Sequence, residues 1–161
     1  RYQSRVESDL DALRSTETGR ALLEELDGTG RATTIETTNG GNVARYTTAA
    51  DRLMTSGNTV NGPGTDTQVG YNRSRIDLGS GNAWSARPPI VGLYHELVHA
   101  ADAGAGAMPT GETDGARNRE RIAVGLDIDQ DGDPRTPRIQ PNSNTENGFR
   151  DELNLERRAR Y

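Results

Sequence analysis

The sequence contains no cysteine, no lysine and only two histidines. Without cysteine, it can form no disulfide, no thiolate zinc site and no cysteine nucleophile. All 19 basic residues are arginine, which also excludes a Schiff-base lysine and a P-loop lysine. A GC-rich genome would account for the missing lysine, and so would work in a eukaryotic cytosol, where ubiquitin is attached to lysine. Any histidine chemistry must come from His95 and His99.

Apolar residues are also scarce. Hydrophobic residues make up 31% and aromatic residues 4% of the 161 positions, a low share for a globular chain. We therefore expect a small core, of a size that a bound metal or a partner can help to hold. The length predicts a single domain over residues 1–161.

Charge and hydropathy exclude several classes of partner. The net charge of −5 and the lack of a basic stripe argue against nucleic-acid binding. No apolar run approaches the roughly 18 residues that span a bilayer, so we expect no membrane partner. We expect a monomer that acts on a protein substrate. Because the chain opens at Arg1 without a signal segment, we expect a domain excised from a longer bacterial protein.

Two helices are predicted over residues 4–27. An apolar stripe at helical spacing runs through the first half and resumes in the second. Between them, Ser and Thr at 15–19 can cap the second helix, and Gly28 lies where a C′ glycine would.

Short strands are predicted in the next part of the chain. The Thr-rich segment 31–38 and the segment 42–48 flank an Asn-Gly-Gly turn at 39–41, which predicts a β-hairpin. Residues 67–71 and 75–78 are predicted as two further strands.

The clearest helix signal follows Pro88-Pro89, because proline is favoured in the first helical turn. This helix should end near Gly104 or Gly106. A short helix is predicted at 116–125 and a closing helix at 145–154, with irregular structure between them.

The predicted central helix carries the pattern H-E-x-x-H, from His95 to His99. Histidines at i and i+4 project from one helical face, so both can bind one Zn²⁺. Glu96, the next residue round the helix, can take a proton from a zinc-polarised water that attacks a carbonyl. Both histidines of the chain fall in this pattern, which raises its weight above that of a chance match.

A catalytic zinc needs a third protein ligand, and without further His or Cys this should be a carboxylate. Glu120 is the first candidate, because it lies on a predicted helix 21 residues after His99, as in gluzincins. Asp102 is the second candidate, and it could instead accept a hydrogen bond from an imidazole N–H. Asp114 and Glu146 are weaker candidates.

The oxyanion formed during peptide hydrolysis also needs stabilisation. Tyr94, Arg150 and Tyr161 are candidates, although each is individually more typical of a surface or packing residue. Residues 127–133 match the start of an EF-hand loop, but loop position 12 is Arg138 where calcium needs a bidentate Glu. This segment is better explained as an acidic surface loop.

Several segments together resemble one family, the NleD-like effector zinc metallopeptidases. They are LYHELVHAADAGAG, RERIAVGLDID with DGDPRTPR, TENGFRDELNLERRARY and, near the start, TETGRALLEEL. The resemblance implies a zincin fold with His95 and His99 as zinc ligands and Glu96 as base. Glu120 corresponds to the Glu before the A-V-G-L stretch, and Arg150 to the Arg of the E-N-x-x-R stretch. Characterised members are bacterial effectors that cleave stress-activated MAP kinases in the activation loop.

The sequence thus predicts a compact α+β zincin-like domain with a small β-sheet packed on the active-site helix. The predicted function is zinc-dependent cleavage of a protein in a target or host cell, after secretion or translocation into its cytosol. A toxin domain of a larger secreted protein fits as well as an injected effector. Two alternatives stay open, a binding module with a structural zinc site and a calcium-binding module built on 127–133.

Overall fold

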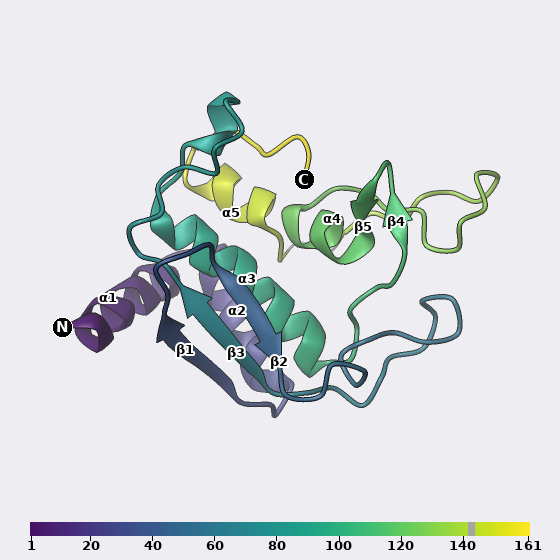
Figure 1. Ribbon diagram of the computed structural model, residues 1–161, viewed down its shortest axis with the longest axis horizontal. Coiled ribbons are helices and arrows are strands. Elements are labelled where there is room, and N and C mark those ends of the chain that lie inside the picture. Colours follow the sequence, from purple (N-terminus) through teal and green to yellow (C-terminus); the bar gives the residue numbers. More distant parts are fainter. Residues whose placement is uncertain (142–143) are drawn as a thin grey trace.

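The computed structural model describes residues 1–141 and 144–161, and within them it is an α+β fold of helices around a small mixed sheet (Figure 1). This confirms the predicted fold class. The helices are α1 (Tyr2–Arg14), α2 (Glu17–Gly28), α3 (Pro89–Gly104), α4 (Asn118–Val124) and α5 (Glu146–Glu152), with a 3-10 turn at Ala83–Ser85. The strands are β1 (Thr33–Thr37), β2 (Val43–Tyr46), β3 (Thr67–Tyr71), β4 (Glu112–Thr113) and β5 (Ala116–Arg117).

Helix α3 forms the centre of the molecule. It packs against α2, α4 and α5 and against strands β2 and β3 of the sheet (Figure 1). Every residue from Val91 to Gly104 is buried. A helix that is buried all round forms a core element, so any polar side chain on α3 is placed inside the protein.

The two N-terminal helices confirm the prediction for residues 4–27. Thr16 caps α2, because its Oγ1 accepts a hydrogen bond from the Gly19 amide at 3.1 Å. A Cβ at Gly19 would collide with the Leu13 carbonyl, so only glycine allows the two helices this close approach. The prediction of Gly28 as C′ was wrong: Gly28 is the last helical residue, and Gly30 adopts the positive φ of 65°.

The predicted hairpin of 31–38 and 42–48 was also wrong. The sheet order is β1-β3-β2, so β3 separates the two strands, pairing parallel with β1 and antiparallel with β2. The burial pattern gives the reason. Val69 and Tyr71 of β3 are fully buried and take the centre, whereas β1 and β2 are partly exposed and lie at the edges. Strand β2 is therefore an edge strand, next to α3.

The remaining predictions had mixed outcomes, and the strand predicted at 75–78 was wrong. Segment 75–78 forms no strand and contributes only the bridge from Asp77 to Ala86. The helix predicted from 116 begins at Asn118, because 116–117 pair with β4 in a two-stranded ribbon. The helix after Pro88-Pro89 and the closing helix are confirmed as α3 and α5.

The described part of the segment 127–145 is irregular, as expected, apart from a bridge between Ile128 and Ile139. Residues 142–143 of that prediction lie outside the described residues. None of the described helices is both long enough and apolar enough to cross a bilayer.

Candidate metal centre

The two histidines of the motif lie one turn apart on the same face of α3. Their rings are in edge-to-face contact with centroids 4.8 Å apart, and both side chains are buried. Because α3 is the central helix, the two imidazoles are held inside the protein and not on a mobile surface.

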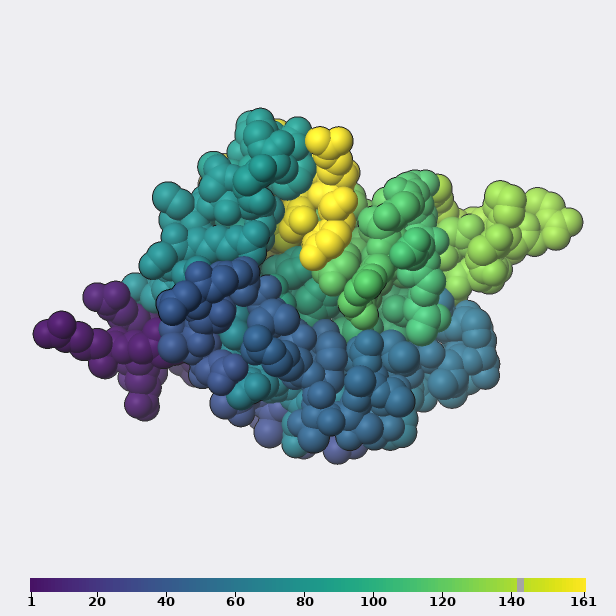
Figure 2. Space-filling view, in the orientation of Figure 1, coloured from purple at the N-terminus to yellow at the C-terminus, as the bar shows by residue number. Residues whose placement is uncertain are grey.

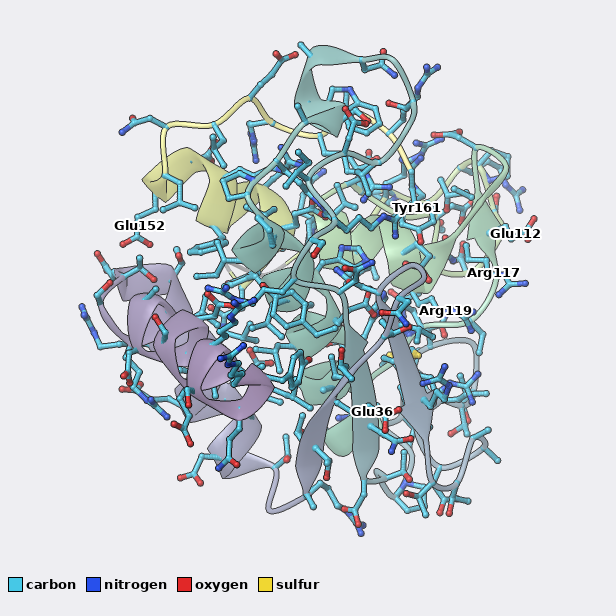
Figure 3. The ribbon with its side chains drawn as sticks, turned by 60° about the vertical axis from the view of Figure 1, so that its left-hand side comes forward. Glu36, Glu112, Arg117, Arg119, Glu152 and Tyr161 are labelled. Carbon is cyan, nitrogen blue, oxygen red and sulfur yellow. The ribbon has the colours of Figure 1, made fainter. Side chains whose placement is uncertain are left out.

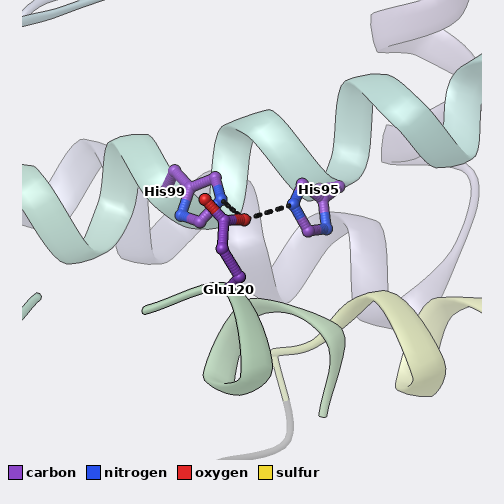
Figure 4. A group of neighbouring side chains, drawn as sticks. All are labelled: His95, His99 and Glu120. Atoms are coloured by element: carbon purple, nitrogen blue, oxygen red, sulfur yellow. Dashed lines mark hydrogen bonds and ion pairs between the residues drawn. The ribbon is translucent and has the colours of Figure 1, made fainter. Parts of the chain in front are cut away.

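Helix α4 brings Glu120 to the same point (Figure 4). Its Oε2 lies 2.9 Å from His99 Nε2 and 3.4 Å from His95 Nε2. The ligand atoms of these three residues all lie within 4.8 Å of one another, and among the described residues they form the one group that could hold a metal ion. The structure thus brings together the two histidines and the carboxylate that ranked first in the sequence.

Asn118 fixes the start of α4 and so the position of Glu120. Its Nδ2 donates to the carbonyls of Thr110 and Asp129 at 2.8 and 3.1 Å, and its Oδ1 accepts from the Thr113 hydroxyl at 2.6 Å. These bonds tie α4 to the segments on both sides of it. The candidate third ligand therefore stands on an anchored helix end.

Electrostatics favours an ionised carboxylate at this point. Burial by itself would raise the pKa of Glu120, but its hydrogen bonds to His95 and His99 outweigh burial and hold the pKa well below its usual range. Burial would likewise lower the pKa of His95, yet hydrogen bonds to Glu120 and Glu146 raise it to about 9. A site that attracts a proton this strongly also attracts a cation.

Glu146 orients His95 from the far side of the ring. His95 Nδ1 lies 2.8 Å from Glu146 Oε2, and an ionised carboxylate can only accept, so Nδ1 carries the proton. In the metal-free protein Nε2 also carries a proton, which it shares with Glu120. A metal ion would replace that proton, and Nε2 would then offer its lone pair on the side facing Glu120 and His99. Glu146 was a weak candidate for a ligand, but the structure places it behind the imidazole and outside the group of ligand atoms.

Three arginines surround Glu146, which is fully buried. Arg87 and Arg150 donate to Oε1 at 3.1 and 2.9 Å, and Arg158 donates to Oε2 at 3.3 Å. Arg150 also donates to the carbonyls of Trp84 and Glu156. Arg150 is thus occupied in holding Glu146, which does not fit the oxyanion role considered for it.

Asp102 lies away from the group of ligand atoms. Its Oδ2 has no hydrogen-bond partner among the described residues, and its side chain lines an apolar cavity with Met54, Ile122 and Ile128. Burial, followed by the charge of Glu25, raises the pKa of Asp102 to about 8. The oxygens of Asp102 are not among the ligand atoms that converge at His95, His99 and Glu120, so the structure does not place the second-ranked candidate as the third ligand.

Glu96 lies where two cavities meet. One, of about 350 Å³, is shared with His95, and the other, of about 210 Å³, is shared with His99 and Glu120. Tyr161 also lines both, and Arg119 lines the second (Figure 3). Glu96 therefore faces the space in which a substrate would meet a bound metal.

The three residues considered for the oxyanion have different surroundings. Tyr94 is fully buried, stacks on Phe149 at 4.5 Å and donates to the Thr18 carbonyl at 3.3 Å, so it faces the core and not the cavities. Tyr161 stacks on the His95 ring with centroids 6.0 Å apart. Of the three candidates, only Tyr161 lies at the site.

Sequence reasoning missed the arginines Arg87, Arg158 and Arg119. Arg119 pairs with Glu120 at 3.5 Å. The spacing of the arginines does not predict which of them lie at the site, because these arginines come from separate segments of the chain. The E-N-x-x-R stretch was the available signal, since its Glu and Arg are the buried pair Glu146 and Arg150.

The acidic loop does not form a cation site. Asp127 pairs with Arg121 at 3.0 Å, and Asp133 pairs with Arg135 at 2.7 Å. Asp129 and Asp131 accept hydrogen bonds from backbone amides of the same loop. Asp114, the remaining ligand candidate, pairs with the arginines at 121 and 138. These carboxylates are engaged in turns and surface ion pairs.

The Peptidase_M91 family model, described as effector protein, matches residues 1–161. The chain belongs to this family. It is the NleD-like family that the sequence motifs resemble, and the match extends over the whole chain. No curated protein and no solved structure matches the chain. Membership of a peptidase family and the group of two histidines and a glutamate together indicate a metallopeptidase effector.

Proposed function

We propose that the protein is a zinc-dependent endopeptidase that cleaves a protein in a target or host cell. The observation that carries this proposal is the convergence of His95 Nε2, His99 Nε2 and Glu120 Oε2 within 4.8 Å, with Glu96 beside them at the junction of two cavities. The continuous core from α1 to α5 supports residues 1–161 as one domain.

The donor set fits zinc. Two imidazole nitrogens and one carboxylate oxygen form the ligand set of gluzincin-type sites, and borderline donors of this kind suit Zn²⁺. When bound there, zinc would act as a Lewis acid and lower the pKa of a coordinated water to about 7. A structural zinc site would use four protein ligands. The described residues offer three, which favours catalysis over a purely structural role.

Glu96 is proposed as the general base. Glu96 lines one cavity together with His95 and the other together with His99. It can take a proton from the attacking water and deliver it to the leaving amine, a role worth roughly 10²–10⁴ in rate.

The edge strand β2 is proposed to bind the substrate backbone. In the described sheet, β2 pairs only with β3, so its other edge is free. Val43, Ala44 and Tyr46 line the same cavity as Glu96 and His99. A peptide added to this edge would gain main-chain hydrogen bonds, a common mode of peptide recognition, and would pass over the metal centre.

Tyr161 and Arg119 are proposed to stabilise the oxyanion. Burial, followed by the charge of the Glu120 carboxylate and a hydrogen bond to it, raises the pKa of Tyr161 to about 12, so its hydroxyl keeps its proton at neutral pH and can donate. Arg119 lines the same cavity and adds a positive charge. Donors placed beforehand at such a point are a main source of rate enhancement.

The family description as an effector supports a route of secretion or translocation into a host or target cell. By the family resemblance, the substrate is proposed to be a stress-activated MAP kinase. We propose a monomer that acts on protein without nucleic-acid or membrane partners.

A comparison of wild type with Glu96→Gln tests the proposal. Both proteins should bind one equivalent of zinc, and after incubation with a host-cell lysate only wild type should generate new peptide termini detectable by mass spectrometry. Retained cleavage by Glu96→Gln would contradict the assigned base. Zinc binding without any cleavage by wild type would instead support a structural site.

A further inference from the structure

The larger cavity beside the candidate metal centre is basic. Four arginines line it, Arg75, Arg87, Arg158 and Arg160, and Glu96 is the one acidic side chain among its described lining residues. The chain as a whole carries a net charge of −5. The cavity thus has the opposite sign to the protein that contains it.

Two of these arginines are built into the protein. Arg87 and Arg158 are buried, and both contact the carboxylate of Glu146. Arg150 contacts the same carboxylate, so one negative charge is shared among three positive ones. Burial is the main cause that lowers the pKa of Arg87; the charge of Glu146 opposes it, and the charges of Arg158 and Arg150 add to it. The floor of the cavity therefore carries positive charge that the protein itself does not balance.

The other two arginines extend this charge toward solvent. Neither Arg75 nor Arg160 forms an ion pair within the part of the chain that the structure describes, whereas the exposed Arg14 and Arg135 each pair with an aspartate. Arg160 belongs to the C-terminal segment, which lies between the loop 72–87 and α4 on the face seen in Figure 2. An anion entering here would meet arginines from both sides.

Part of the wall between these charges is apolar. Trp84 and Leu78 line the cavity, and the guanidinium of Arg158 lies over the rings of Trp84 and Tyr161, 5.4 and 4.5 Å from their centroids. Stacking of this kind fixes the direction of a guanidinium. The cavity is shaped for a side chain with an apolar stem and an anionic end.

We propose that this cavity is a substrate subsite that selects an anionic side chain, a carboxylate or a phosphate, close to the cleaved bond. The proposal rests on the proposed peptidase function, because it identifies part of that substrate. His95 and Glu96 line both the cavity and the metal centre, and an extended peptide advances about 3.3 Å per residue. The selected residue therefore lies within about three positions of the bond that is cleaved.

Cleavage of a peptide library tests this inference. Zinc-loaded wild type is incubated with peptides prepared from a host-cell proteome, and the residues flanking each cleaved bond are counted. Asp, Glu or phosphorylated residues should be enriched at one position. Synthetic peptides carrying Asp there should be cleaved roughly 10- to 100-fold more efficiently than those carrying Asn. Treating half of the library with phosphatase separates the two anions, since only a phosphate preference is lost.

Reversing the charge of two cavity arginines, with a matched control outside the cavity, tests whether these arginines cause the preference. The Arg75→Glu/Arg160→Glu double variant should lose the acidic preference and favour a basic residue at that position. The control Arg14→Glu/Arg135→Glu changes the net charge equally at exposed sites outside the cavity and should keep the preference. Binding to zinc-loaded Glu96→Gln, followed by fluorescence anisotropy, should be tighter for the Asp peptide than for the Asn peptide.

The outcomes separate this inference from the proposed function. Cleavage by wild type without any acidic preference, or a preference unchanged by the charge reversal, would overturn the subsite and leave the peptidase intact. Absence of cleavage in wild type with equal binding of Asp and Asn peptides would overturn both.

Discussion

The two histidines of the metal centre have unlike surroundings. His95 Nδ1 is held by Glu146, which three buried arginines hold in turn. His99 Nδ1 is buried and has no hydrogen-bond partner among the described residues, and the same is true of Oδ2 of Asp102 one turn further along α3. One of these candidate ligands, His95, is oriented by a charged network, and the other, His99, by helix α3 and Glu120 alone.

This difference predicts how substitutions on the two sides of the site will differ in their effects. The network around Glu146 joins α3, α5, the residues before α3 and the C-terminal segment, so a change there acts on both the fold and the orientation of a ligand. Asp102 faces an apolar cavity instead. A change at Asp102 should act on stability and leave the metal unaffected.

The largest expected effect is at the network. Glu146→Gln removes the counter-charge of three buried arginines, so the free energy of unfolding should fall by about 3–5 kcal/mol. Denaturant unfolding measures this, with the exposed Glu156→Gln as control. A Glu146→Gln protein within about 1 kcal/mol of wild type would contradict the importance of the network.

The ligand assignment gives the next effect. Glu120→Ala should weaken zinc binding by at least about 100-fold, because it removes a ligand and not merely a neighbour of one. Asp102→Ala should bind zinc almost as wild type does. Isothermal titration of both variants decides the matter, and the reverse ranking would make Asp102 the ligand.

Asn147 ties the C-terminal segment to α5, on the His95 side of the site. Its Nδ2 donates to the Arg158 carbonyl at 2.9 Å and its Oδ1 accepts from the Arg158 amide at 2.7 Å, both buried. Asn147→Ala should lower the free energy of unfolding by about 1–3 kcal/mol, because two backbone groups lose their partners. Faster proteolytic trimming of residues 155–161 would accompany it. A variant with unchanged stability and trimming would contradict this anchoring.

The last effect, on the His99 side, depends on pH. The pKa of Asp102 is about 8 in the folded protein, above its usual 3.8, so the unfolded chain releases this proton first as pH rises. The contribution of Asp102 to stability is complete below pH 4 and is lost toward pH 8, by at most about 1.4 kcal/mol per unit. Relative to wild type, Asp102→Asn should gain stability between pH 5 and pH 7 when both are measured with metal chelated. A constant difference between the two proteins would argue against a protonated Asp102.

The features predicted from sequence were those encoded locally. Thr16, the proline pair before α3 and the i, i+4 histidines each act within one turn of helix, so α2, α3 and the histidine pair could be derived directly. Pairing of β1 with β3 joins residues more than thirty positions apart, and the turn signal at 39–41 favoured the wrong neighbour.

The buried charged residues were the other feature that the sequence did not predict. Nothing in the local sequence distinguishes Arg87 and Arg158 from exposed arginines. Their contact with Glu146 arises only because the fold places α5 beside α3. Tyr94 was named as an oxyanion candidate but judged more typical of a packing residue, and it does pack: it precedes His95 in the sequence but projects from another face of the helix, against Phe149.

X-ray absorption spectroscopy of the zinc-loaded protein tests the central claim most directly. One zinc per chain should be coordinated by two imidazole nitrogens and by oxygen, and Glu120→Ala should change the oxygen shell while both imidazoles remain. Failure to bind zinc, or a spectrum with fewer than two imidazoles, would contradict a metal centre built from His95, His99 and Glu120.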